Sequence, residues 1–182
     1  MKLLVANRGE IAVRVIRTAL ELGIPTVAVY STADANSLAV EMADEAVCIG
    51  PPAARDSYLD VRNVIGAAEV TGCDAVHPGY GFLSENPDFA TECANNGIRF
   101  VGPAPEVMAR MGDKIRAKEA ATQAGLPVLG GSEGGVTDVA AARGAAEAAG
   151  FPILLKASAG GGGRGMRRVD SADELERAFE NA

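Results

Sequence analysis

The sequence predicts an α/β fold in which a parallel sheet is covered by helices on both faces. Two observations predict it. Through residues 1–101, short β-branched segments alternate with helical patterns, and the strand segments are mostly apolar without a regular alternation of apolar and polar residues. A strand without such alternation is buried on both faces, which is the environment of a parallel sheet between helices. The expected arrangement is Rossmann-like.

The elements of this sheet follow one another along the chain. Three glycines, Gly23, Gly72 and Gly97, stand where helices should end, and Pro25 follows the first of them. Glycine readily adopts the left-handed conformation found at helix C-termini, so these residues set the helix boundaries. Strands are expected at residues 3–6, 26–30, 45–49, 75–77 and 99–101, and helices at residues 10–22, 59–71 and 88–96.

A second unit is expected after a helical connector. Two helices, at 104–111 and 114–124, are separated at Gly112, and the glycine-rich segment that follows is typical of a domain boundary. Beyond it we expect a helix at 138–149, strands at 153–157 and 165–169, and a helix that opens at Ser171 with Glu174 completing a capping box. So few strands cannot close a core, so truncation or a missing partner segment is inferred. The predicted domains are residues 1–112, a connector at 113–130 and an incomplete α+β subdomain at 131–182.

Composition excludes several classes of function. The net charge is -7 and the isoelectric point is near 4.8, which argues against binding to a nucleic acid backbone. The apolar start is interrupted by Asn7, Arg8 and Glu10, so it fits neither a signal peptide nor a membrane span. Three cysteines without a Cys-x-x-Cys pair argue against disulfides and a zinc site. A cytoplasmic location is expected.

The turn after the first strand is where a Rossmann enzyme would bind a pyrophosphate. It reads Asn7-Arg8-Gly9-Glu10 and lacks the Gly-x-Gly-x-x-Gly pattern. Glu10 places a negative charge at the helix N-terminus, where it favours the helix dipole and repels phosphate. Structural capping is therefore preferred to dinucleotide binding.

A glycine-rich loop at residues 158–165 directly follows the strand that carries Lys156. Its consecutive glycines leave backbone N–H groups unshielded, so they can wrap around phosphate oxygens. No Gly-Lys-Ser/Thr follows, and residues 166–169 resemble a strand, so a hairpin lid is expected instead of a Walker A loop. A flexible surface hairpin is the alternative. Lys156 lies in an apolar strand, where a buried ammonium needs an anion, and this favours a polyphosphate. The glycines are Gly160, Gly161, Gly162 and Gly163.

Two further segments are candidates for ligand binding. Lys114 places a cation at the start of a helix, which is unfavourable for the helix dipole, although a solvated surface lysine is the alternative. Residues 77–87 leave the carboxyl end of a strand, the edge at which open α/β sheets bind ligands. His77 is the only histidine, which excludes a multi-histidine metal site, and a hydrogen-bonded structural role is favoured over catalysis.

Four segments in order together resemble the biotin carboxylase family. They are ANRGEIAVRVIR at residues 6–17, HPGYGFLSEN at 77–86, GDKIRAKE at 112–119 and LLKASAGGGGRGMR at 154–167. The resemblance runs from the first strand to residue 182. It implies that the first domain is the pre-ATP-grasp domain of that family and that the second is the beginning of its ATP-grasp lid subdomain.

The resemblance also implies an activity and its site residues. Such enzymes use ATP and Mg2+ to activate bicarbonate as carboxyphosphate and then carboxylate biotin on a carrier protein. By similarity, Lys114 and Lys156 contact nucleotide phosphates, the four glycines form the lid, and Met166 lies near the adenine. Tyr80 and Gly81 lie near the biotin pocket by the same similarity. The metal-binding and bicarbonate-binding residues would lie beyond residue 182, so no catalytic or metal residue is assigned, and this segment is expected to be inactive alone.

Partners and alternatives follow from the same resemblance. The expected partners are a biotin carboxyl carrier protein or domain, a carboxyltransferase, and a second copy of the chain, with dimer contacts on the helix that carries Arg14, Arg17 and Glu21. The carboxyltransferase would choose the final acceptor, such as acetyl-CoA, propionyl-CoA or pyruvate. One alternative is another ATP-grasp ligase, which should lack HPGYGFLSEN and the four glycines. The other is a non-catalytic module that dimerises or binds a partner protein.

Overall fold

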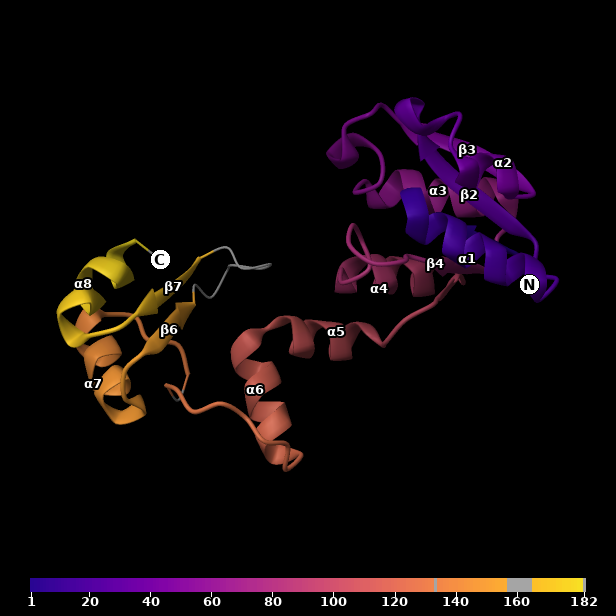
Figure 1. Cartoon of the computed structure of the whole chain (residues 1–182). Coiled ribbons are helices and arrows are strands. Elements are labelled where there is room, and N and C mark those ends of the chain that lie inside the picture. The colour runs from indigo at the N-terminus through magenta and orange to yellow at the C-terminus, as the bar shows by residue number, and fades with distance from the viewer. Residues whose placement is uncertain (133, 157–164, 182) are drawn as a thin grey trace. The chain divides into compact units, whose positions relative to one another are not determined.

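The structure is a computed structural model that describes residues 1–132, 134–156 and 165–181 (Figure 1). The chain forms two compact units, Met1–Gly112 and Asp113–Ala182. Each unit is described by itself.

The first unit is built on a five-stranded sheet in the order β3-β2-β1-β4-β5, and every neighbouring pair is parallel. The chain starts in the middle of the sheet, moves outward to β3, and then crosses β1 to add β4 and β5 on the other side. This order confirms the Rossmann-like prediction. The strands are β1 (Leu3–Val5), β2 (Thr26–Ser31), β3 (Glu45–Gly50), β4 (Ala75–His77) and β5 (Arg99–Phe100).

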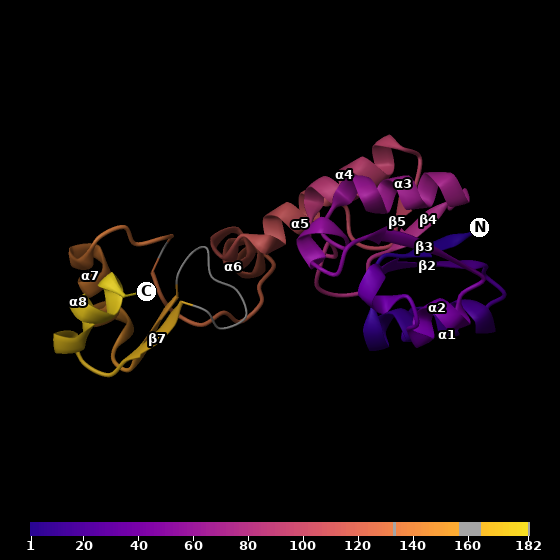
Figure 2. The ribbon, with the colours of Figure 1, turned by 90° about the horizontal axis from the view of Figure 1, so that it is seen from above.

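Helices cover both faces of this sheet (Figure 2). Successive residues of a strand point to opposite faces, so Leu4 packs in the core beneath α3 and α4, whereas Val5 packs against α1 and α2. Phe89 of α4 is fully buried in the larger core and contacts Phe100 edge to face. The helices of this unit are α1 (Gly9–Glu21), α2 (Leu38–Met42), α3 (Val61–Thr71), α4 (Pro87–Asn95) and α5 (Pro105–Gly112), with two 3-10 turns, η1 (Thr32–Asp34) and η2 (Ala54–Asp56).

The helix boundaries follow the glycines and caps of the sequence. Gly23, Gly72 and Gly97 adopt φ values of 67°, 64° and 71°, so all three lie in the left-handed region as predicted. At the start of α3, the carboxylate of Asp60 accepts hydrogen bonds from the backbone N–H groups of Arg62 and Asn63. Such caps satisfy N–H groups that have no partner inside the helix.

The second unit has a small core. Strands β6 (Ile153–Lys156) and β7 (Met166–Val169) pair antiparallel, as the predicted hairpin requires. Helices α7 (Val139–Ala149) and α8 (Ala172–Glu180) contact each other. Their buried side chains meet those of the hairpin in a cluster that includes Ala142, Ala146, Val169 and Leu175. Helix α6 (Lys114–Gln123) precedes them along the chain.

The predicted capping box at the start of α8 is wrong in part. Ser171 is the N-cap residue, but its side chain makes no capping hydrogen bond. The carboxylate of Glu174 accepts from the backbone N–H of Asp170 at 3.2 Å, one residue before the position that a capping box uses. The helix still begins where the sequence predicts, because acidic residues occupy its first turn.

Candidate functional site

The strand order of the first unit reverses between β1 and β4, and open α/β sheets bind ligands at such a point. Asn7 follows β1 there and is buried, with 4% of its surface exposed. Its Nδ2 atom donates to the carbonyl oxygens of Pro78 at 2.7 Å and Tyr80 at 2.8 Å. A β-carbon at Gly79 would lie 2.8 Å from that nitrogen, so only glycine fits. The side chain of Asn7 thus ties β1 to residues 78–82, here called the 78–82 loop.

The first helix turn is joined to the same loop. Glu10 lies in the first turn of α1, and its Oε1 atom accepts a hydrogen bond from the hydroxyl of Tyr80. A carboxylate therefore occupies the region in which a Rossmann enzyme offers backbone N–H groups to a pyrophosphate. Arg8 is the N-cap residue, and its side chain makes no capping bond.

A polar cluster that the sequence analysis missed lies beside this turn. The guanidinium of Arg8 forms a two-pronged ion pair with Asp34, with Nη2 at 2.6 Å from Oδ1 and Nε at 3.0 Å from Oδ2. Asp34 also accepts from the hydroxyls of Ser31 and Tyr58, each at 2.8 Å. The Arg8 guanidinium, aided by these hydroxyls, lowers the pKa of Asp34 to about 2. No local sequence motif predicts this cluster, because its members come from separate parts of the sequence.

Tyr58 connects the polar cluster to the 78–82 loop. Its ring is 2% exposed and stacks on Phe82 with centroids 5.0 Å apart and planes 7° from parallel. Phe82 has a φ of 41°, the one positive φ among the described non-glycine residues. A side chain in that conformation is strained, so the contacts around Phe82 must hold it there.

His77 ends β4 and is half-buried. Its Nδ1 atom accepts a hydrogen bond from the backbone N–H of Gly79 at 3.0 Å, as expected for a hydrogen-bonded residue. Burial lowers the pKa of His77, because an imidazolium is less stable than the neutral ring away from water. The neighbouring candidates Tyr80 and Gly81 lie in the 78–82 loop, where the side chain of Tyr80 is 56% exposed.

The hairpin of the second unit brings two other candidates together. Lys156 pairs directly with Met166 across the strands, and Leu154 lies two residues away on the same face. This face is open, since Leu154 is 49% and Met166 is 47% exposed. An ammonium beside exposed apolar side chains can pair with a phosphate while the apolar groups contact a flat ring.

The predicted burial of Lys156 is wrong. Helices α7 and α8 cover one face of the hairpin, and the side chains of Ile153, Leu155 and Val169 pack with them. Lys156 points to the other face and is exposed. Its charge is solvated, so a buried ammonium in need of an anion no longer supports the phosphate site. Residues 160–163, the predicted lid glycines, lie outside the described residues.

Lys114 is the first residue of α6 and is exposed. The preceding Asp113 caps the helix by accepting from the N–H groups of Ile115 and Arg116 at 2.9 and 3.0 Å. The carboxylate of Asp113 thus offsets the unfavourable placement of a cation at this end. Lys114 stands on a different element from the Lys156–Met166 pair.

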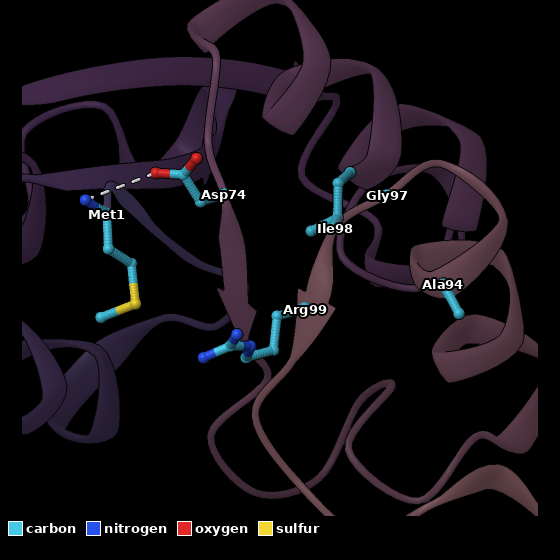
Figure 3. Close-up of a pocket in the computed structure, with 6 residues that line it drawn as sticks. All are labelled: Met1, Asp74, Ala94, Gly97, Ile98 and Arg99. Carbon is cyan, nitrogen blue, oxygen red and sulfur yellow. Dashed lines mark ion pairs between the residues drawn. The ribbon is translucent and has the colours of Figure 1, made fainter.

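A hollow at the opposite edge of the sheet holds none of the predicted residues (Figure 3). It lies where β4 and β5 begin. The carboxylate of Asp74 is paired there with the terminal amine of Met1 at 3.6 Å and accepts the backbone N–H of Lys2 at 2.7 Å. The residues that line this hollow are Met1, Asp74, Ala94, Gly97, Ile98 and Arg99.

The described residues contain no candidate metal-binding group and no helix that could span a membrane. Within it, His, Cys, Asp and Glu side chains form no group of three or more that could hold a metal ion. None of the described helices has the length and apolar character needed to cross a membrane.

Two family models match successive parts of the sequence. The biotin carboxylase N-terminal domain matches residues 1–108. The carbamoyl-phosphate synthase L chain ATP binding domain matches residues 113–182. The two matches meet near the boundary between the two compact units.

Curated relatives agree with these matches. The chain is 54% identical over 174 residues to biotin carboxylase 1 of Bacillus subtilis, covering 96% of this chain and 39% of that protein. It is 53% identical over 179 residues to the biotin carboxylase of Haemophilus influenzae, covering 98% of this chain and 40% of that protein. The chain thus spans less than half the length of these relatives.

Solved structures share the fold. A Campylobacter jejuni biotin carboxylase in complex with β-γ-ATP has a TM-score of 0.95 at 47% identity, with 99% of this chain and 40% of that chain covered. The biotin carboxylase domain dimer of Hydrogenobacter thermophilus 2-oxoglutarate carboxylase, in complex with MgADP, ADP and bicarbonate, has a TM-score of 0.91 at 49% identity, with coverage of 99% and 40%. With a family model matched over more than half of its length, the chain belongs to the biotin carboxylase family.

Proposed function

We propose that this chain is the N-terminal part of a biotin carboxylase that uses ATP and bicarbonate to carboxylate biotin on a carrier protein. The observation that carries the proposal is the pairing of Lys156 with Met166 on the open face of the hairpin. It places a cation for phosphates next to an apolar surface for a nucleotide base. Residues 1–108 of the same chain match the biotin carboxylase N-terminal domain, and residues 113–182 match an ATP binding domain.

Different residues of the second unit contact different parts of the nucleotide. Lys156 and Lys114 neutralise phosphate oxygens, as cations do in phosphate sites. Met166 contacts the adenine with its adaptable thioether side chain. Gly160, Gly161, Gly162 and Gly163 close over the phosphates through their backbone N–H groups. Mg2+ bound with the ATP supplies further charge neutralisation.

The first unit contributes the biotin side. Tyr80 and Gly81 contact biotin from the 78–82 loop, whose backbone is held by Asn7. Arg14, Arg17 and Glu21 are exposed on α1 and contact a second copy of the chain in a homodimer. A carrier protein and a carboxyltransferase subunit complete the assembly, and the enzyme works in the cytoplasm.

The most direct test replaces part of a relative with this chain. The 182 residues are substituted for the matching segment of the 54% identical Bacillus subtilis protein. We expect this chimera to hydrolyse ATP only when bicarbonate and free biotin are present. Lys156→Ala should lower kcat/KM for ATP by about 100-fold, since a lost charge-assisted contact to the transferred group costs roughly 3 kcal/mol. Lys118→Ala, a lysine of α6 outside the proposed site, is the matched control.

The alternatives predict different results. Another ATP-grasp ligase would give a chimera whose ATP hydrolysis is indifferent to biotin. The match to a carbamoyl-phosphate synthase model at residues 113–182 allows that reading for the second unit, whereas the match at residues 1–108 favours biotin. A non-catalytic module would give an inactive chimera. Calorimetry would then show no heat on addition of Mg-ATP, either with Lys156 in place or in Lys156→Ala.

A further inference from the structure

The 78–82 loop is held at its start by a buried side chain from outside it. Asn7 donates from Nδ2 to the carbonyls of Pro78 and Tyr80, at 2.7 and 2.8 Å. The Oδ1 atom of Asn7 accepts from the backbone N–H of Arg8 at 2.9 Å, which fixes the orientation of the amide. Because Asn7 is only 4% exposed, water cannot easily replace these bonds. The loop backbone from Pro78 to Tyr80 therefore has a fixed path.

The end of the loop has a second buried anchor. The ring of Tyr58 stacks on Phe82 at 5.0 Å. Its hydroxyl donates to Asp34 at 2.8 Å and accepts from the N–H of Ser31 at 2.9 Å, which adds polar contacts to the ring stack. Phe82 sits in the left-handed region, with φ of 41°, a conformation that needs support from its surroundings. Tyr58 supplies that support.

Between the two anchors, Tyr80 presents its side chain outward. It is 56% exposed, and its hydroxyl contacts Glu10. A fixed backbone with an exposed aromatic side chain is suited to meet a ligand, because little ordering is left to be done on binding. We propose that Asn7 and Tyr58 are positioning residues that hold the 78–82 loop so that Tyr80 and Gly81 meet biotin in one preformed geometry. This inference rests on the proposed function.

Substitutions at Tyr58 separate anchoring from general stability. Tyr58→Leu keeps an apolar side chain but removes both the ring stack and the hydroxyl. Tyr58→Phe keeps the stack and loses only the hydroxyl, so it should restore most of the anchoring. Ile16→Val is the matched control, since Ile16 is fully buried on the opposite face of the sheet and its truncation lowers stability without touching the loop.

Hydrogen exchange in this chain measures the anchoring directly. The N–H of Gly79 donates to His77 Nδ1 and that of Ser84 donates to the carbonyl of Gly81, so both report on the loop. In Tyr58→Leu these two amides should exchange at least about tenfold faster, while amides of β1 and β4 keep their protection. Ile16→Val lowers global stability, so exchange should rise in the loop and in the strands alike. The same uniform rise in Tyr58→Leu would overturn the inference.

Kinetics of the chimera test the link to biotin. Tyr58→Leu should raise KM for free biotin about tenfold with kcat within about threefold, and Tyr58→Phe should stay close to the unsubstituted chimera. A loosened loop with an unchanged KM for biotin would contradict the positioning role. An inactive unsubstituted chimera would contradict the proposed function and the biotin part of this inference, and the exchange data would still decide whether Tyr58 anchors the loop.

Discussion

The 78–82 loop and the β6–β7 hairpin differ in how their candidate residues are held in place. In the loop, buried side chains outside the segment, Asn7 and Tyr58, fix the backbone that carries Tyr80. In the hairpin, Lys156 and Met166 lie on the face opposite to the one that α7 and α8 cover, and Met166 is 47% exposed. One candidate site is therefore held by the protein's own contacts, whereas the other offers charge and apolar surface that a ligand would have to order.

The same contrast separates the two cores. The first unit has a sheet, helices on both faces and a buried cluster centred on side chains such as Phe89 and Leu4. The second unit buries few side chains beneath a two-stranded hairpin. Burial of apolar surface is the main source of stability, so the first unit should tolerate more damage before it unfolds.

Phe89→Ala is expected to have the largest effect. Phe89 is fully buried and contacts Phe100 edge to face, so its loss leaves a large cavity. The free energy of unfolding of the first unit should fall by roughly 4 kcal/mol. Urea denaturation followed by NMR signals of β1 and β4 measures it. A loss below about 1 kcal/mol would mean that this core is far looser than the structure shows.

Leu175→Ala tests the smaller core. Leu175 is fully buried between α8 and the hairpin. We expect the free energy of unfolding of the second unit to fall by roughly 3 kcal/mol, while that of the first unit stays unchanged. Signals of β6 and β7 should then disappear at a urea concentration that leaves β1 unchanged. Simultaneous loss of both sets of signals would show that the units do not unfold independently.

A third prediction concerns pH and the polar cluster of the first unit. The pKa of Asp34 is lowered from 3.8 to about 2, chiefly by Arg8. Since the folded pKa lies below the unfolded one, this carboxylate stabilises the fold fully above about pH 4, and the contribution disappears as pH falls towards 2. Asp34→Asn should therefore lower stability by about 2 kcal/mol at pH 7 and by much less at pH 2. Urea curves of both proteins across this range measure the difference, and a constant gap would contradict the ion pair.

The smallest expected effect is at a helix cap. Asp60 accepts hydrogen bonds from the N–H groups of Arg62 and Asn63 at the start of α3. Asp60→Ala should lower the stability of the first unit by about 1 kcal/mol. Asp60→Asn keeps an oxygen acceptor and serves as the control, which should lose only a few tenths of that amount. Equal losses in the two variants would assign the effect to charge instead of capping.

Sequence reasoning succeeded where the signal is local. Apolar segments predicted the strands, and Gly23, Gly72 and Gly97 predicted the helix ends, because a left-handed φ is a property of one residue. It missed α2, which spans only Leu38–Met42 and is too short to show a helical period.

It also missed features that depend on distant parts of the chain. The contacts of Tyr58 join residues far apart in sequence, and no pattern predicts which of them will meet. The burial of Lys156 was predicted wrongly because an apolar strand segment does not reveal whether helices cover one face or both. Pattern alone can place a residue on a strand, but tertiary packing decides its exposure.

The methyl group of Met166 offers the most direct test that the open hairpin face binds the nucleotide. In the chimera, its NMR signal is identified by its absence in Met166→Leu and followed as Mg-ATP is added. The signal should shift with ATP, and Lys156→Ala should raise the half-saturating concentration at least about tenfold, while Lys118→Ala leaves it unchanged. ATP binding that leaves the Met166 signal in place, or an affinity that Lys156→Ala does not alter, would contradict this assignment.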